Sequence, residues 1–140
     1  MHLPELNYVA ILVAGLAKFI LGGLWFSPLL FVKPWLAEMK FTEEDMAKAK
    51  AKGMAHSLVP TFLMGLVQVF ALAIVLKTMK PECLGCAAGT GLMLGVAFAA
   101  VPIATNALFE QRSAKLVLIT AGHDVTAIVI SSVILAAWPK

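Results

Sequence analysis

The side chains best able to do chemistry in this chain are a lysine, an aspartate and a histidine inside long apolar stretches. Lys18 lies near the middle of the first stretch, and His123 and Asp124 lie in the last one. An unpaired charge at the bilayer centre costs at least about 2.5–3.5 kcal/mol on insertion scales. At 1.5 Å per residue Lys18 would lie about 18 Å from the outer membrane edge, and in a core about 30 Å thick Asp124 would lie roughly 16 Å from it. These similar depths predict an ion pair between Lys18 and Asp124.

This intramembrane pair has two main interpretations. It can be a structural salt bridge that locks two helices together, or a proton- or substrate-linked pair that lines a cavity. Snorkelling of Lys18 towards the headgroups is a third alternative. Histidine exchanges protons near neutral pH, so a relay through His123 and Asp124 competes with a buried histidine bonded to a neighbouring helix. Since nothing fixes a spacing between His56 and His123, a haem site is not supported, and we expect no cofactor and no metal.

Further polar residues interrupt the second and third apolar stretches. Gln68 is expected to hydrogen-bond between helices, because lipid offers it no partner. Pro102 should break the third helix and free the carbonyl of Phe98. Beyond that break, a polar cluster is expected at the cytoplasmic mouth, with an interfacial charge network as the preferred interpretation: Asn106, Glu110 and Arg112.

Two cysteines, Cys83 and Cys86, form a C-x-x-C pattern at the outward end of the third stretch. The pattern lacks the second pair that zinc would need, and no βαβ context supports a thioredoxin-like role. Oxidising surroundings would permit a disulfide. We expect two packing thiols.

The elements that must position these side chains are membrane-spanning helices. The chain has 140 residues, of which 61% are hydrophobic and 14% charged, against about 45–50% and about 25% in a soluble domain. A chain this short has too little interior to hide so much apolar surface from water. Since a span needs roughly 20 mostly apolar residues, the sequence predicts an all-α, integral membrane four-helix bundle. It forms one transmembrane domain over residues 1–140, with helices at about 6–26, 57–76, 84–108 and 116–138.

Positive charge in the loops predicts the orientation of the spans. The side with the 28–56 connection and the 109–115 turn carries seven basic residues: Lys33, Lys40, Lys48, Lys50, Lys52, Arg112 and Lys115. The other side carries three: Lys77, Lys80 and Lys140. By the positive-inside rule the first side is cytoplasmic. We expect a bacterial inner (plasma) membrane protein with both termini outside the cytoplasm.

The 28–56 connection should be a short amphipathic element. Its first half has the apolar spacing of an interfacial helix, at Phe31, Trp35, Leu36 and Met39. Thr42 resembles an N-cap and Gly53 a helix end. A solvated connector is preferred over a docking surface.

Small residues four apart predict where the helices pack closely. The stripes are Ala10, Ala14, Lys18 and Gly22 in the first helix; Thr61, Gly65 and Gln68 in the second; Gly91, Gly95 and Ala99 in the third; and Thr120, Asp124, Ala127 and Ser131 in the fourth. These stripes should face the bundle interior or a subunit interface.

Some short motifs resemble those of a known family. The run from Leu21 to Pro28 (LGGLWFSP), the Lys33-Pro34-Trp35 that follows it, and the stretch from Asn106 to Arg112 (NALFEQR) resemble the domain of unknown function 1761 family of small membrane proteins. The run Ala121-Gly122-His123-Asp124 is similar to the family's fourth-helix motif. The resemblance spans nearly the whole chain and implies a four-helix membrane protein without an established activity.

The chain departs from that family pattern at the positions that drew attention first. The resemblance implies Gly-Tyr-His in the fourth helix, so the family's tyrosine falls on His123 and its histidine on Asp124. It also implies a small or apolar residue where Lys18 stands. Departures at two positions of similar depth fit a compensating pair, and they argue against a family-wide function for it.

Two functions remain open from the sequence. The first is a small oligomeric channel or transporter for protons, ions or a small solute, which would use Lys18, Asp124 and His123. The second is a non-transporting structural or regulatory membrane protein whose polar residues only fix helix packing. An enzyme is not expected, because no nucleophile–base–acid triad, phosphate loop or H-E-x-x-H is present. The expected partners are the lipid bilayer, further copies of the chain and a small solute or ion, while the net charge of +3 reflects topology rather than nucleic-acid binding.

Overall fold

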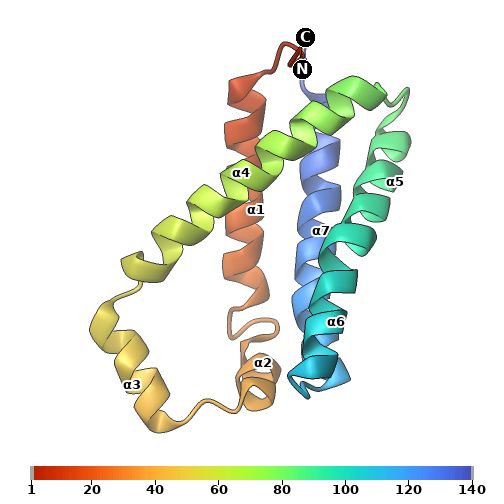
Figure 1. Ribbon diagram of the computed structural model, residues 1–140. Coiled ribbons are helices and arrows are strands. Elements are labelled where there is room, and N and C mark those ends of the chain that lie inside the picture. Colours follow the sequence, from red (N-terminus) through yellow and green to blue (C-terminus); the bar gives the residue numbers. More distant parts are fainter. Residues whose placement is uncertain (1, 140) are drawn as a thin grey trace.

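The computed structural model describes residues 2–139, and every regular element in that range is a helix. Figure 1 shows their arrangement. The elements are α1 (Tyr8–Trp25), α2 (Val32–Met39), α3 (Glu43–Lys52), α4 (Ala55–Met79), α5 (Leu84–Gly95), a π-helical turn η1 (Val96–Ala100), α6 (Val101–Phe109) and α7 (Ala114–Ala137).

Four of these segments are long and apolar enough to cross a membrane: α1, α4, the continuous run Leu84–Phe109 and α7. The predicted four-span, all-α architecture is therefore confirmed. The start of α1, the end of α7 and the α4–α5 turn lie at one end of the bundle, the terminal side (Figure 1). The α2–α3 segment and the α6–α7 turn lie at the other end, the connector side (Figure 1). Lys140, which the charge count placed on the terminal side, lies outside the described residues.

Side-chain caps account for several of the helix starts. The Asn7 side chain accepts a hydrogen bond from the Ala10 N–H at 3.0 Å, and Ser113 caps α7 through the Leu116 N–H at 3.2 Å. As predicted, Thr42 is the N-cap of α3 and Gly53 ends that helix, at φ 81°. Thr42 and Asp45 also form a reciprocal capping box. Hydrogen bonds from Thr42 hold the pKa of the Asp45 carboxyl below its ordinary value. The bond from the Thr42 backbone has the larger effect, and the bond from its hydroxyl group the smaller.

The closest helix contact joins α5 to α7. A Cβ atom added at Gly91 would lie 2.9 Å from Ser132 Cβ and 3.1 Å from the backbone Cα of Val129. One at Gly95 would lie 3.1 Å from the Cα of Val125. Gly91, Gly95 and Ala99 are all buried, so the predicted stripe of small residues on the third span does face the interior.

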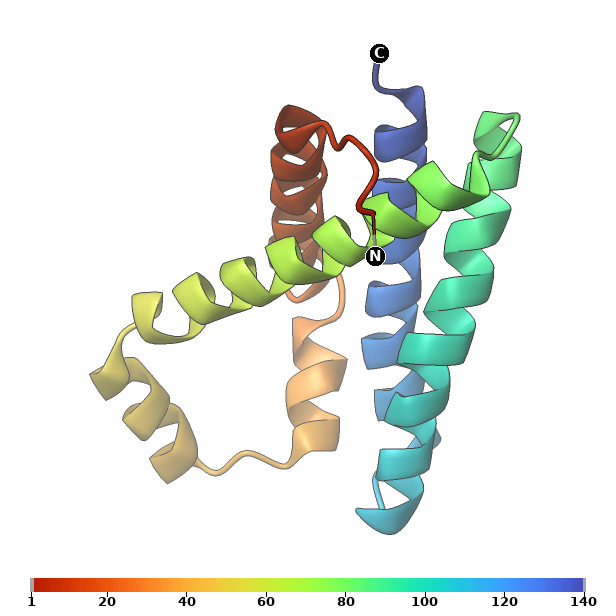
Figure 2. The same ribbon diagram turned by 45° about the horizontal axis from the view of Figure 1, so that its top comes forward.

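The helix α4 crosses the bundle obliquely and packs through one half only (Figure 2). Its buried residues all lie in its second half, from Val69 to Leu76. There Val69 and Ala73 join Ile11 and Ala14 of α1 in one apolar cluster, and Leu72 and Leu76 join Ala99 and Ile128 in another. The first half of α4 has no buried residue, so it stands away from the core on the connector side.

The prediction that Pro102 breaks the third helix is right only for its α-helical hydrogen bonding, which is interrupted just before this residue; the span itself is not broken. The helix runs on from Leu84 to Phe109, and the backbone adapts one turn earlier through the π-helical segment Val96–Ala100. In that turn the Val101 N–H donates to the Val96 carbonyl. Such a local π adjustment re-pairs the backbone groups that a proline would leave without partners in lipid.

The two halves of the connector differ in how they meet the bundle. The side chain of Ser113, at the start of α7, donates a hydrogen bond to Glu38 of α2, and Arg112 Nη1 lies 3.9 Å from Met39 Sδ. By contrast, every residue of α3 is exposed. The expectation of a solvated connector therefore holds for α3, whereas α2 docks on the α6–α7 turn.

The expectation of two packing thiols is also wrong. Cys83 and Cys86 are joined by a disulfide, and both residues are exposed. They lie at the N-terminus of α5 on the terminal side, where no neighbouring helix covers them.

Candidate functional site

Lys18 reaches a different partner from the one that its depth suggested. Its ammonium group donates a hydrogen bond to the side-chain oxygen of Gln68 on α4. Among residues 2–139 no ion pair joins Lys18 to Asp124, so the predicted salt bridge is wrong. Asp124 still lies within electrostatic range of Lys18. The amide of Gln68 takes the direct contact with Lys18 because it projects from α4, the helix that faces this lysine across the pocket.

Asp124 pairs instead with its neighbour in sequence. Its Oδ1 lies 2.9 Å from Nδ1 of His123. If Nδ1 carries the proton of this bond, the other ring nitrogen, Nε2, is left as an acceptor. Nε2 is buried and has no hydrogen-bond partner among the described residues. A buried polar atom without a partner is rare in native structures and points to a missing water, ion or ligand.

Lys18 and His123 line one pocket of about 450 Å³ between α1 and the first half of α4. Its walls are mostly apolar and include Phe19, Phe26, Met54, Leu58 and Phe62. A few polar groups in a mainly apolar cavity of this size are typical of a small-molecule site.

Glycines make room for both polar side chains. A Cβ atom at Gly22 would lie 3.3 Å from His123 Nε2, and one at Gly65 would lie 3.7 Å from Lys18 Cε. Gly22 lets the imidazole approach the backbone of α1, and Gly65 leaves the side of α4 open where the lysine stem passes. Gly22 and Gly65, which belong to the predicted stripes of small residues on the first and second spans, therefore also line the pocket.

Aromatic rings hold the histidine from the connector side. The Trp25 indole N–H donates to the Ile119 carbonyl at 3.0 Å, and its ring covers Gly122, where an added Cβ would lie 3.3 Å away. The rings of Trp25 and Phe26 lie 6.0 and 5.3 Å from that of His123. Trp35 of α2 stacks edge-on against Phe26 at 5.4 Å. The runs 21–28 and 121–124, far apart in the chain, thus meet around one imidazole.

The expected polar cluster at the connector side forms only in part. Arg112 Nε lies 3.5 Å from Glu110 Oε2, in an exposed ion pair. Asn106 is exposed, and none of the side-chain hydrogen bonds found among residues 2–139 involves its amide. Exposed pairs of this kind contribute little stability, which agrees with the interfacial charge network preferred from the sequence.

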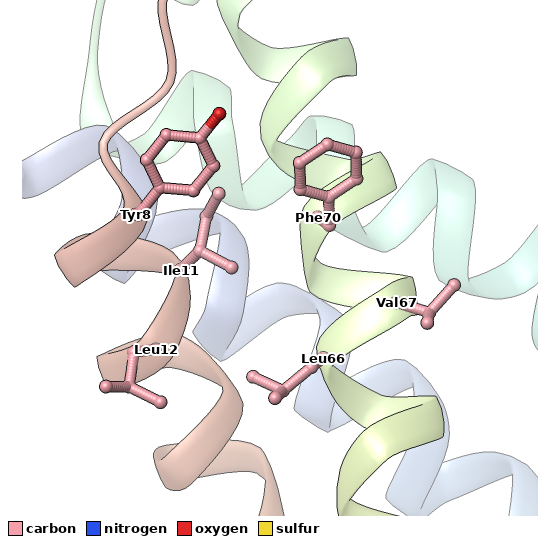
Figure 3. A pocket seen from close by; sticks show the side chains of 6 residues that line it. All are labelled: Tyr8, Ile11, Leu12, Leu66, Val67 and Phe70. Atoms are coloured by element: carbon pink, nitrogen blue, oxygen red, sulfur yellow. The ribbon is translucent and has the colours of Figure 1, made fainter.

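A second crevice between α1 and α4 offers no comparable chemistry. It measures about 370 Å³ and lies towards the terminal side, lined by Tyr8, Ile11, Leu12, Leu66, Val67 and Phe70. Figure 3 shows these side chains projecting from the two helices, with the tyrosine hydroxyl at the upper rim. The lining carries no charged group, so the polar pocket around Lys18 and His123 is the stronger candidate.

The arrangement around the polar pocket can handle a charge and a proton. The ammonium of Lys18 has hydrogens beyond the one given to Gln68, because lysine carries three donors. The Asp124 carboxylate orients His123, as carboxylates orient histidines in metal and catalytic sites. The pocket is thus lined by a cation and by an oriented imidazole, whose Nε2 is itself buried beside Gly22. No group of three or more potential metal-ligating side chains occurs in the described range.

Sequence reasoning did not identify Gly22, Gly65, Trp25 and Phe26 as parts of this site. Gly22 and Gly65 were assigned to packing stripes, and the two aromatics were quoted only as part of a family motif. The signal that could have found them is the joint presence of that motif and the Gly-His pair of the last span.

The four apolar spans and the polar pocket between them define a small α-helical membrane protein. The model of the family described as "Protein of unknown function (DUF1761)" matches residues 9–136. The chain therefore belongs to this family, as its motifs indicated. No curated protein and no solved structure matches the chain.

Proposed function

We propose that this protein is a small oligomeric channel or transporter that lets protons, ions or a small solute cross the membrane through the polar pocket. The observation that carries the proposal is His123 Nε2, a buried ring nitrogen without a hydrogen-bond partner among the described residues, on a side chain that lines the same pocket as Lys18. A polar atom in that position is most simply explained by an occupant that enters and leaves.

The roles of the residues follow from their contacts. Lys18, held by Gln68, attracts an anion or the negative end of a solute. His123 accepts and releases a proton at Nε2, and Asp124 orients its ring through the contact at Nδ1. Because Asp124 also lies within range of Lys18, protonation of the histidine changes the field at the ammonium, which would couple proton and solute movement.

The pocket lies on one flank of a four-helix chain, and four helices are few for a complete pathway. We therefore propose a homo-oligomer in which further copies and lipid complete the walls. The orientation proposed with it places the connector side in the cytoplasm and both termini outside, in a bacterial inner membrane, because seven basic residues lie on the connector side.

Flux measurements on liposomes test the proposal. The full chain, Asp124→Asn and Glu44→Gln are reconstituted at equal density, and proton and chloride flux are followed with entrapped indicator dyes under imposed gradients. Glu44 lies on the exposed helix α3, so it is a matched carboxylate-to-amide control. We expect flux in the wild type and the control and at least a tenfold loss in Asp124→Asn, in the range that loss of one charge-assisted contact produces. Equal background flux in all three samples would rule out conduction of both ions.

The alternative, a structural or regulatory protein without transport, is favoured by one observation. Lys18 and Asp124 each have a partner within the same protomer, Gln68 and His123, so both can serve packing alone. A Lys18→Met, Gln68→Leu double variant separates the two functions. Gln68 is exposed and Lys18 is only partly buried, and replacing both partners of a hydrogen bond by apolar groups can be nearly neutral. A packing role therefore predicts a folded variant that behaves like the wild type. The transport role predicts a folded variant without flux.

A further inference from the structure

The disulfide between Cys83 and Cys86 has a position that differs from that of a structural cross-link. Both cysteines belong to one short segment, with Cys83 as the N-cap of α5 and Cys86 in its first turn. A disulfide stabilises mainly by closing a long loop of the unfolded chain, and this one encloses only the two residues between the cysteines. It also ties no second helix to α5. This bond therefore contributes less stability than one that closes a long loop.

The two sulfur atoms are not equivalent. The backbone N–H of Cys86 donates a hydrogen bond to Sγ of Cys83 at 2.9 Å. Cys83 is thus at the N-terminal end of a helix, where the partial positive charge of the backbone favours a thiolate. The first turn of α5 contains no acidic residue. Glu82, which precedes the helix, is exposed, so solvent screens its charge.

Both cysteines are exposed on the terminal side of the bundle, away from the polar pocket. A reactive disulfide must be reached by a second thiol, because exchange depends on access as well as on thiolate stability. The site satisfies this condition, whereas packing thiols would be covered by neighbouring helices.

We propose that the Cys83–Cys86 disulfide is a thiol–disulfide exchange site that oxidises dithiols on the side of the membrane where both termini lie. A thiolate of the dithiol attacks Sγ of Cys86, the bond between the two cysteines breaks, and Cys83 leaves as the thiolate that the Cys86 N–H stabilises. The second thiolate of the dithiol then attacks its own sulfur in the mixed disulfide and releases Cys86. The dithiol loses two electrons and two protons to become a disulfide, and Cys83 and Cys86 become two thiols.

The first test measures the predicted asymmetry of the two sulfurs. In the full chain in detergent micelles, Cys86→Ser leaves Cys83 as the single thiol, and Cys83→Ser leaves Cys86. At pH 7 iodoacetamide should alkylate Cys83 at least about tenfold faster than Cys86, as expected of a thiolate stabilised at a helix N-terminus. Equal rates, or a faster Cys86, would overturn the assignment. Circular dichroism of both variants shows whether α5 is retained.

The second test measures exchange itself in the wild type. The oxidised protein, in liposomes, is mixed with a synthetic peptide that carries two cysteines, and peptide disulfide is quantified after acid quenching. We expect one peptide disulfide per accessible protein molecule, with Cys83 and Cys86 becoming open to maleimide in step. The double variant Cys83→Ser, Cys86→Ser should give none. A disulfide that stays intact under a millimolar excess of the peptide would show that the bond is inert and would refute the proposal.

Discussion

The helix pair α5–α7 and the helix pair α1–α4 solve the same packing problem in opposite ways. Gly91 and Gly95 bring α5 so close to α7 that a single added carbon would meet backbone atoms about 3 Å away. Gly22 and Gly65, on α1 and α4, instead border a pocket of about 450 Å³. Gly15 of α1 also packs closely on α4, since an added Cβ would lie 2.5 Å from Leu66 Cδ2, but its neighbour is the end of a side chain. Small residues thus serve backbone contact in one pair, and side-chain contact and open space in the other.

The difference follows from where the helices separate. The helices α5 and α7 stay in contact along their length. By contrast, α4 contributes buried residues only from Val69 to Leu76, and its first half diverges from α1 on the connector side. Lipid supplies no hydrophobic force to close such a gap, because acyl chains are as apolar as the side chains. A polar pair such as Lys18 and Gln68 can therefore hold the diverging helices at a fixed separation.

The largest expected effect comes from adding one methyl group to the tight pair. Gly91→Ala should lower the free energy of unfolding by about 2 kcal/mol, because backbone atoms of α7 cannot move aside. Gly89→Ala, two residues away with nothing within 4 Å of an added Cβ, is the matched control and should not destabilise. Thermal unfolding of both variants in the same detergent measures the contrast. Equal melting temperatures would remove the distinction between the two helix pairs.

Trp25 connects the two helix pairs, because its indole N–H at the end of α1 donates a hydrogen bond to α7. Trp25→Phe keeps an aromatic ring but loses the hydrogen bond to the Ile119 carbonyl. It should therefore lower the free energy of unfolding by about 1 kcal/mol, as measured by thermal unfolding in detergent. Phe26→Leu is a useful comparison, since Phe26 packs on His123 without a hydrogen bond to α7. If Trp25→Phe is neutral while Phe26→Leu is not, ring packing rather than the indole N–H joins the pairs.

A smaller gain in stability is expected in the turn that leads from α6 into α7. Gln111 has a φ of 57°, and the hydrogen bonds from Gln111 to Leu108 and from Arg112 to Ala107 are those of a Schellman motif. Because glycine adopts this conformation without steric cost, Gln111→Gly should raise the free energy of unfolding by about 0.5 kcal/mol. Lys115→Gly lies inside α7, so in thermal unfolding it should instead lower the free energy of unfolding.

The smallest effect on the bundle is expected at α3, outside both helix pairs. The pKa of Asp45 is lowered in the folded state by its hydrogen bonds from Thr42. Its contribution to α3 is therefore present above the unfolded pKa and is lost as pH falls through the lower folded value. NMR shifts of residues 43–52 should report loss of α3 in acid while the spans stay folded. Asp45→Asn should weaken α3 already at neutral pH. If acid instead unfolds α3 and the four spans together, α3 is not independent of the bundle.

Much of the fold could be predicted because lipid imposes it locally. The length and apolarity of the four stretches required four spans, and Thr42, Asp45 and Gly53 specified the limits of α3. The site was harder to predict, since it depends on contacts between helices. Lys18 and Asp124 were predicted to pair with each other but bond instead to Gln68 and His123, because depth along a helix says nothing about rotation around it. The π-helical turn before Pro102 and the disulfide were also missed, since both depend on how the backbone adapts locally.

The sequence by itself therefore determined the number of spans, which loops share an end of the bundle and the membership of the family. These rest on apolar length, on the order of the segments along the chain and on short motifs. Only the tertiary structure decided that α4 diverges from α1, that Lys18 bonds to Gln68, and that Gly22, Trp25 and Phe26 surround His123. The physical reason is that hydrophobic burial in lipid acts on each segment separately, whereas the rotation and tilt of a helix are set by the shapes and polar groups of the helices that it contacts.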